Sequence, residues 1–246
     1  MHNIDNLYYP SWMEGEWKAT QTLRKATTPL GLKYVGGPAG SVDIASASMR
    51  EQLLQVNVPV SFRLKWVKTK FGVAEDRLFN SRQRLDGFAG RTVVSSVEYN
   101  NVGGSNRVSI LALGGGENDP LQTTTVRFKG PAAQKTFVIS HGEDKDVAPT
   151  ADTTATITAT TTKDRVWSGY ELLRNIFALT NTNTAPPVTT DTELIWKFEK
   201  IDETNVKGQL RIASYLNAQS DSLYFDARYR AVSFSDYDIK LEKISL

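Results

Sequence analysis

The feature that most constrains the fold is a strict alternation of apolar and polar residues between Val56 and Trp66. Apolar side chains stand at every second position of this stretch. Because successive side chains of a β-strand point to opposite faces, the pattern predicts a strand with one face in the core. Pro59 has no amide hydrogen to donate, which favours a sheet edge or a bulge at that point. We expect the buried face to hold Val58, Val60, Phe62, Leu64 and Trp66.

Shorter stretches with the same alternation follow along most of the chain. A meander of about ten such strands, with few helices between them, is typical of an antiparallel barrel or sandwich. The last stretch changes phase near Ser235 and Asp236, which predicts a β-bulge there. The expected strands after the first are residues 91–100, 107–113, 123–129, 135–140, 153–161, 193–201, 206–216, 221–227 and 231–244.

One segment has helical periodicity. In residues 76–89 the apolar side chains recur at helical spacing, Asp76 is placed to cap the first turn, and Gly90 follows the end. Residues 164–179 fit a helix and a strand equally well, so both interpretations stay open. The polar residues 141–152 and 180–192 are predicted loops. We expect residues 1–246 to form a single all-β domain, an antiparallel barrel with one main α-helix.

Composition excludes several classes of protein. The chain has 29 Lys and Arg against 27 Asp and Glu, a net charge of +2, which excludes the strongly basic surface of a general nucleic-acid binder. It contains no cysteine, so it has neither disulfides nor a thiol nucleophile. It lacks the run of about 20 apolar residues that a transmembrane helix needs. We therefore expect no nucleic acid among the partners and no transmembrane segment.

Motifs with catalytic chemistry are weak. The two histidines, His2 and His141, lie far apart in the sequence, and no serine stands in a G-x-S-x-G turn. Neighbouring carboxylates such as Glu75 and Asp76 remain as an option for acid–base chemistry, but the start of a helix explains this pair as well. The residues therefore predict no catalytic site and no metal site, and favour a protein that is not an enzyme.

Aromatic residues are the more informative group. The chain has five Trp, nine Tyr and ten Phe. They either pack in an ordinary core or line an apolar cavity, because a barrel of eight or more strands can enclose a small ligand. The candidates for a ligand-binding lining are Phe62, Trp66, Tyr99, Trp167, Trp196 and Tyr215.

Four charged residues interrupt apolar segments and form a candidate buried polar cluster: Arg77, Glu171, Arg174 and Arg211. One interpretation is that each side chain points to solvent. The other is that Glu171 pairs with one of the three arginines near the barrel mouth, since a buried carboxylate needs a cationic partner with two hydrogen bonds.

Several segments together resemble a known family. Trp12, Gly15 and Trp17 resemble the Trp–Gly–Trp opening of the calycins, the lipocalin-like barrels, in which the Trp packs across the barrel floor. Further matching segments are residues 29–31, 73–80, 169–174, 209–216, 224–228, 231–232 and 237–241. In this order they resemble a lipocalin-like family of cyanobacteria and chloroplasts whose members commonly carry thylakoid-targeting sequences.

The resemblance implies a lipocalin-like barrel and a non-enzymatic accessory protein. It points to a peripheral subunit of a photosynthetic complex such as a photosystem, on the lumenal side of the thylakoid membrane. Two alternatives stay open. The barrel could carry a hydrophobic ligand such as a pigment or a lipid, or the chain could be an enzyme of the chromophore-lyase kind, since some bilin lyases share this barrel class.

Overall fold

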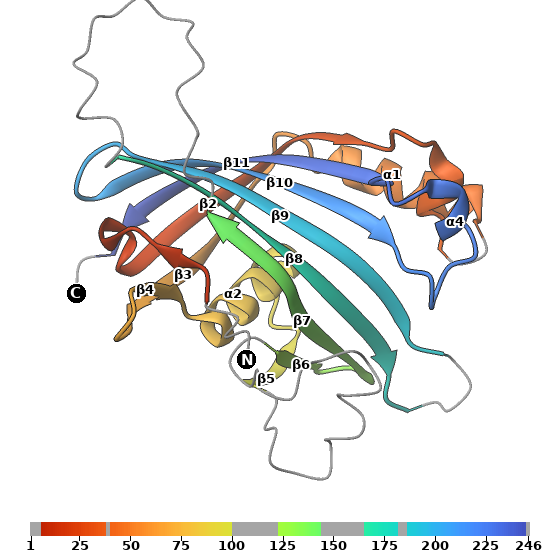
Figure 1. Cartoon of the computed structure of the whole chain (residues 1–246), viewed down its shortest axis with the longest axis horizontal. Helices are drawn as coiled ribbons and strands as arrows, with labels where there is room; N and C mark the ends of the chain where they lie inside the picture. Colours follow the sequence, from red (N-terminus) through yellow and green to blue (C-terminus); the bar gives the residue numbers. More distant parts are fainter. Residues whose placement is uncertain (1–5, 38–39, 100–122, 144–164, 182–185, 245–246) are drawn as a thin grey trace, which may run out of the picture.

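The computed structural model describes residues 6–37, 40–99, 123–143, 165–181 and 186–244. In these residues eleven antiparallel strands form one sheet, which curls into a half-barrel (Figure 1). The strands are β1 (Tyr8–Tyr9), β2 (Gly15–Thr27), β3 (Pro59–Lys68), β4 (Val73–Glu75), β5 (Val94–Tyr99), β6 (Thr124–Phe128), β7 (Ala132–Glu143), β8 (Val166–Leu179), β9 (Val188–Lys200), β10 (Asn205–Leu216) and β11 (Ser233–Lys243).

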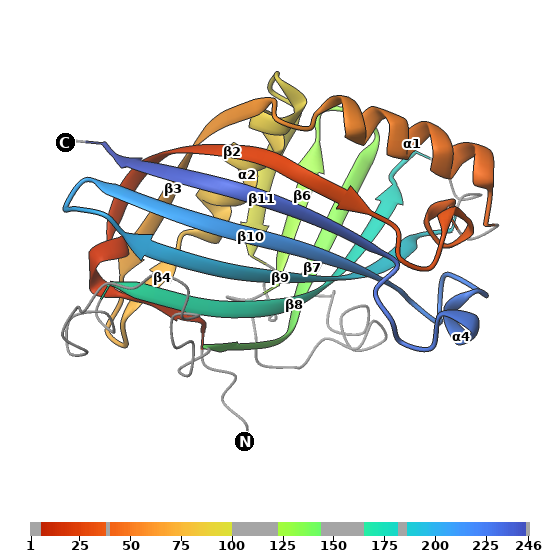
Figure 2. The same cartoon turned by 90° about the horizontal axis from the view of Figure 1, so that it is seen from above.

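Hydrogen bonds place the strands in the order β1-β4-β3-β2-β11-β10-β9-β8-β7-β6-β5. The long strands β2 and β8 to β11 run side by side along the molecule (Figure 2). In the described part of the chain, β1 and β5 are the two edges of the sheet and do not pair with each other. The all-β antiparallel class is therefore confirmed, whereas the closed barrel that we expected is not.

The strand predicted from the alternation is β3. It begins at Pro59 and buries Phe62, Leu64 and Trp66 on one face, as expected. Val58 precedes the strand and is exposed, so the buried face is shorter than the sequence pattern. Among the described residues, β4 pairs with β3 only from Trp66 onward, so Pro59 stands where β3 has one strand neighbour. A proline is tolerated there because its missing N–H leaves no ladder bond unmade.

The predicted helix is α2 (Arg77–Ala89), which lies on the concave side of the sheet against β3 and β5 (Figure 1). The side chain of Asp76 accepts a hydrogen bond of 3.1 Å from the amide of Phe79 and so caps the first turn. Gly90 ends the helix in the left-handed region at φ 63°. Asp86 lies in the last turn of the helix, and its carboxylate accepts hydrogen bonds from the amides of Val93 and Val94. These bonds connect the helix to β5.

A second helix of the same length, α1 (Val42–Leu54), corrects the expectation of one main helix. Ser41 caps it by accepting the amide of Ile44 at 3.3 Å. The helix packs on the 3-10 helix η2 (Leu32–Val35) and on β2, and Ala45 is its one buried residue. No apolar stripe marks such a helix in the sequence, because its contacts need only one small side chain.

Other predicted elements have mixed outcomes. Of the ambiguous residues 164–179, Val166–Leu179 form β8. A register shift between Asp236 and Tyr237 confirms the predicted bulge in β11. The predicted loop over residues 180–192 is too long, since β9 begins at Val188. The expected strands at residues 107–113 and 153–161 lie outside the described residues, as does most of the predicted loop at 141–152.

The expected strand at residues 221–227 is wrong, because this segment contains the short helix α4 (Tyr224–Ala227). Its start is a local turn in which the side chain of Asp221 accepts the amide of Leu223 at 2.8 Å. The backbone carbonyl of Asp221 also accepts the amide of Tyr224. An aspartate that binds nearby amides competes with strand pairing, which the apolar pattern alone does not reveal.

The opening of the chain folds as a turn into the sheet. A 3-10 helix, η1 (Ser11–Met13), precedes Gly15, whose φ of 123° lies in a region that favours glycine. Trp17 then enters the core, and its indole N–H donates to the carbonyl of Met13 at 2.8 Å. The Gly and the second Trp of the opening motif thus have direct structural roles.

Candidate functional site

Four of the aromatic residues proposed as a cavity lining lie in the core of the half-barrel: Phe62, Trp66, Trp167 and Trp196. The ring of Tyr9 lies between two of them, with centroids 5.8 Å from Trp66 and 4.5 Å from Trp167. Trp167 also stacks on Phe198 at 6.0 Å. These rings contact one another, so much of the space inside the curl is filled by the protein itself.

Two strand glycines make this packing possible. A β-carbon at Gly208 would lie 2.6 Å from the ring of Phe198, and one at Gly169 would lie 2.7 Å from the ring of Trp167. Both distances are far below van der Waals contact, so the aromatic rings occupy the places that side chains would need. The glycines on β8 and β10 therefore shape the concave face.

The two tyrosines of the proposed lining lie elsewhere. Tyr99 is half-buried at the end of β5, where burial raises the pKa of its hydroxyl. Tyr215 does not line the interior as we proposed, because β10 directs its side chain to the face opposite Leu210. Its hydroxyl donates to Glu193 at 2.8 Å, and burial together with Glu193 raises the pKa of Tyr215 to about 12.

Five polar side chains meet on the concave side of the sheet, and we call them the ion-pair cluster: Glu75, Arg77, Asn80, Arg84 and Glu171. Arg77, the first residue of α2, donates two hydrogen bonds to the carboxylate of Glu171 on β8. The bond from Nη1 to Oε2 is 3.1 Å long. This fork geometry gives the buried carboxylate a cationic partner for both oxygens. The pair therefore joins the start of α2 to β8.

Glu75 is the second acid of the cluster. Its Oε1 accepts hydrogen bonds from Nη1 of Arg84 at 2.6 Å and from Nδ2 of Asn80 at 3.0 Å. Asn80 is fully buried and also binds the backbone amide and carbonyl of Lys65, at 2.7 and 3.1 Å. Nη1 of Arg77 lies 4.0 Å from Oε2 of Glu75. Arg77 therefore contacts both acids, and Arg84 contacts Glu75.

The electrostatics of the cluster favour fixed charges. Burial by itself would raise the pKa of Glu75, but the two arginines and the asparagine hold it below its usual value. Burial raises the pKa of Tyr9 well above its usual value, and the charges of Glu75 and Glu171 add to the effect. Glu75 therefore stays ionised near neutral pH and Tyr9 stays protonated. Groups with pKa values so far from neutrality are poorly placed to exchange protons with a substrate.

The other two arginines of the proposed buried polar cluster, Arg174 and Arg211, do not belong to it. Arg174 and Arg211 point to the face opposite the ion-pair cluster, because Arg174 lies three positions from Glu171 on β8 and Arg211 lies next to Leu210 on β10. Arg174 binds Asp191 with two hydrogen bonds of 2.8 and 2.9 Å. Arg211 binds Asp236 in the same way, at 2.7 and 3.0 Å. Of the three arginines considered as partners of Glu171, the structure pairs it with Arg77.

Three members of the cluster were missed by the sequence analysis: Glu75, as a partner of arginines, Asn80 and Arg84. A signal for them exists. Arg77, Asn80 and Arg84 recur at intervals of three and four residues, so they share one face of the predicted helix. We read the apolar stripe of this helix as the buried one, whereas its fully buried residue is Asn80.

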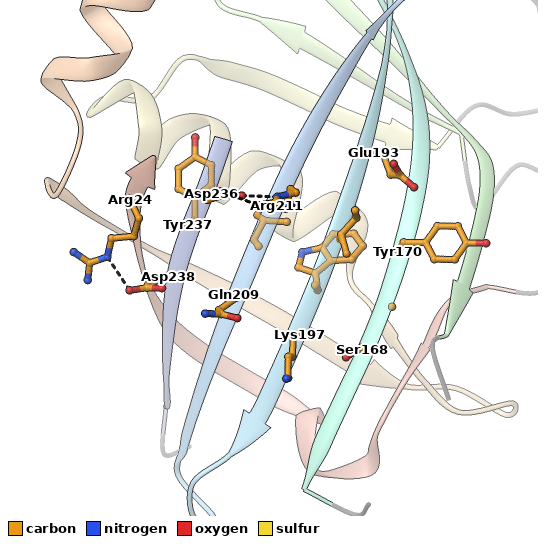
Figure 3. A pocket seen from close by; sticks show the side chains of 14 residues that line it. Arg24, Ser168, Tyr170, Glu193, Lys197, Gln209, Arg211, Asp236, Tyr237 and Asp238 are labelled. Carbon is orange, nitrogen blue, oxygen red and sulfur yellow. Dashed lines mark hydrogen bonds and ion pairs between the residues drawn. The ribbon is translucent and has the colours of Figure 1, made fainter. Parts of the chain in front are cut away.

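The outer face of the sheet carries a hollow of about 580 Å³ over β8 to β11 and the end of β2 (Figure 3). We call it the outer-face hollow. Two ion pairs, Arg24–Asp238 and Arg211–Asp236, lie along one side of it. The side chains that point outward in it are Arg24, Ser168, Tyr170, Glu193, Lys197, Gln209, Arg211, Asp236 and Asp238. Ile195 also lines the hollow and pairs with Tyr170 and Arg211, so it lies on the same face.

Two side chains give the outer-face hollow features that a partner could recognise. Ile195 is an apolar side chain that is 40% exposed amid polar neighbours. Lys197, two positions along β9, forms no ion pair with any described residue. Together they present an apolar contact and a cation within one hollow, on a rigid strand in the middle of the sheet.

No helix in the described ranges combines the length and the apolar character required to cross a membrane. Among the same residues, no three His, Asp or Glu side chains gather as a metal ion would require.

Comparison with known proteins identifies a family without an assigned function. Residues 4–245 match the model of a domain of unknown function, DUF6816, and the chain belongs to this family. No curated protein and no solved structure matches the chain.

Proposed function

We propose that this member of the DUF6816 family is a non-enzymatic accessory protein that binds a partner protein through the outer-face hollow. The observation that carries the proposal is the contrast between the two faces. The concave face holds packed aromatic rings and an ion-pair cluster whose charges are engaged with one another. The outer face leaves Ile195 exposed and Lys197 without an ion pair among the described residues. Exposed apolar surface with a polar rim is typical of protein–protein contacts.

The resemblance described above supplies the cellular setting of this proposal. We infer that the partner belongs to a photosynthetic complex, such as a photosystem, at the lumenal side of the thylakoid membrane. A partner suited to the hollow places an apolar side chain on Ile195 and a carboxylate on Lys197, since unpaired cations recognise acids across an interface.

The test is a matched pair of substitutions. Ile195→Glu puts a charge into the outer-face hollow, whereas Ile201→Glu puts the same charge on an equally exposed isoleucine just beyond β9, where the exposed fraction is 43%. Tagged variants are expressed in a photosynthetic host, and solubilised thylakoids are run on a native gel. We expect Ile195→Glu alone to leave the large complex. Equal behaviour of the two variants, or migration of the wild type as a free protein, would contradict the proposal.

A second candidate function, a carrier of a pigment or a lipid, is favoured by one observation. A pocket of about 690 Å³ beside β1 and the start of β8 is walled by Tyr8, Tyr9, Trp12 and Trp167. Among the described residues, the buried indole N–H of Trp167 has no hydrogen-bond partner, and a buried donor without an acceptor is costly. A polar group of a bound ligand would satisfy it.

The carrier proposal has its own test. The purified protein is examined by absorption spectroscopy and by mass spectrometry of extracted lipids. A bound compound that Trp167→Phe loses and Trp196→Phe retains supports the carrier, because Trp196 lies outside this pocket. A protein that purifies without any ligand, or one that keeps it in both variants, contradicts the proposal.

A further inference from the structure

The end of the molecule at α4 carries an exposed aromatic and basic turn, far from the β3–β4 turn in both views (Figures 1 and 2). We call it the aromatic tip, and its residues are Tyr224, Phe225, Arg228, Tyr229 and Arg230. Phe225 is 73% exposed and Tyr229 is 75% exposed. A single exposed aromatic side chain needs no explanation, but two that share one short turn form an apolar patch.

The rings of the tip are arranged as a rigid unit. Tyr224 stands edge-to-face against Phe225, with centroids 5.2 Å apart, and against Tyr229, with centroids 5.1 Å apart. Such perpendicular contacts are favourable for aromatic pairs. The exposed rings are therefore held in place by a third ring rather than left free to turn into the protein surface.

The backbone of the tip is held in an unfavourable conformation. Arg228 and Tyr229 are consecutive and both have positive φ angles, 54° and 61°. The left-handed region is disfavoured for residues with a β-carbon. Hydrogen bonds from the amide of Arg228 to the carbonyl of Tyr224, and from Nε of Arg230 to the carbonyl of Ala227, stabilise it. Local strain at an exposed turn suggests that the display of these side chains is functional.

The charge of the tip is positive. Its acid, Asp226, accepts hydrogen bonds from Lys33 at 2.9 Å and from the hydroxyl of Tyr34 at 2.6 Å. These two partners lower the pKa of Asp226, which stays ionised and neutralises Lys33. Arg228 and Arg230 have no carboxylate partner among the described residues. Two guanidinium groups therefore flank the exposed rings.

We propose that the aromatic tip docks at the headgroup region of an anionic lipid bilayer. Aromatic side chains favour the boundary between lipid headgroups and acyl chains, and flanking arginines bind phosphates. The size of the tip favours this occupant over a protein. Two aromatic rings bury about 300–500 Å², whereas a stable protein interface needs about 800 Å² from each partner. This contact does not depend on the outer-face hollow.

The test is sedimentation of the full chain with lipid vesicles made either of phosphatidylcholine or of equal parts of phosphatidylcholine and phosphatidylglycerol. The wild type is expected to pellet with the anionic vesicles and to be released by salt. Phe225→Ser combined with Tyr229→Ser should lower the partition coefficient about tenfold or more. Arg228→Gln and Arg230→Gln should each lower it about fivefold on anionic vesicles.

The matched control is Phe71→Ser. Phe71 is 71% exposed and lies in the turn between β3 and β4, beside Lys70. This variant should bind vesicles as the wild type does. The proposal is overturned if the wild type does not sediment with anionic vesicles, if the double serine variant binds as well as the wild type, or if Phe71→Ser loses as much binding. Ile195→Glu should bind vesicles normally, so failure of the outer-face hollow and failure of the tip are distinguishable.

Discussion

The two faces of the curled sheet carry the same kind of ion pair in opposite surroundings. On the concave face Arg77 binds Glu171, whose side chain is 1% exposed, whereas on the outer face Arg211 binds Asp236 and is itself 53% exposed. Both arginines donate two hydrogen bonds. Water and salt weaken the outer pair, whereas the buried acid depends on its partner. The same chemistry is therefore part of the buried packing on one face and stays in contact with solvent on the other.

The largest effect is expected at the buried pair. Glu171→Gln keeps the shape of the side chain but removes the carboxylate that binds the guanidinium of Arg77 with two hydrogen bonds, and leaves Arg77 with the more distant Glu75 at 4.0 Å. We expect the free energy of unfolding to fall by about 3–5 kcal/mol, measured by urea denaturation. Combined with Arg77→Met, the loss should be no larger than for either single variant. Two losses that simply add would show that the residues act independently.

A pH-dependent effect should follow at Glu75, in the same cluster. Its pKa in the folded protein lies below the value of 4.5 for the free side chain. The unfolded chain therefore takes up the proton first, and stability falls as the pH drops from about 4.5 through the lower folded-state pKa. Glu75→Gln removes the contribution of this carboxylate and leaves those of other acids with lowered pKa values, such as Asp226 and Asp236. The fall in the free energy of unfolding between neutral and acidic pH should therefore be smaller for the variant than for the wild type, and an equal fall would contradict the cause.

A smaller effect is expected at the helix cap that positions Arg77. Asp76→Ala removes the acceptor for the amide of Phe79 and should lower the free energy of unfolding by about 1 kcal/mol. Asp76→Asn is the control, because its side-chain oxygen can still accept. Both variants are compared by thermal unfolding. If Asp76→Asn lowers the unfolding temperature as much as Asp76→Ala does, the carboxylate charge matters more than the capping hydrogen bond.

The smallest effect is expected on the outer face. Arg211→Met breaks the pair with Asp236 and should change the free energy of unfolding by only about 0–1 kcal/mol. Added salt should reduce the difference in the free energy of unfolding between the wild type and the variant, since salt screens exposed ion pairs. A loss as large as that of Glu171→Gln would mean that the two faces do not differ as we infer.

The candidate site was only partly predictable. The helix, its cap at Asp76 and the burial of Phe62 and Trp66 follow from local patterns, and the structure confirms them. Helix α1 and the α4 turn were missed because neither has an apolar stripe, and their caps and turns depend on Ser41 and Asp221. Such single hydrogen bonds compete with weak apolar patterns and leave little periodicity to detect.

What the sequence by itself determined is the face on which each strand residue lies. Alternation separates Arg211 from Leu210, since a strand turns successive side chains to opposite sides. This phase already argued against our inclusion of Arg211 in the candidate buried cluster. Only the tertiary structure decided that Glu171 meets Arg77, 94 positions away, and that the sheet stays open between β1 and β5 in the described residues. Strand order and long-range ion pairs depend on how the curled sheet and α2 pack together. Local periodicity carries no information about which distant segments become neighbours.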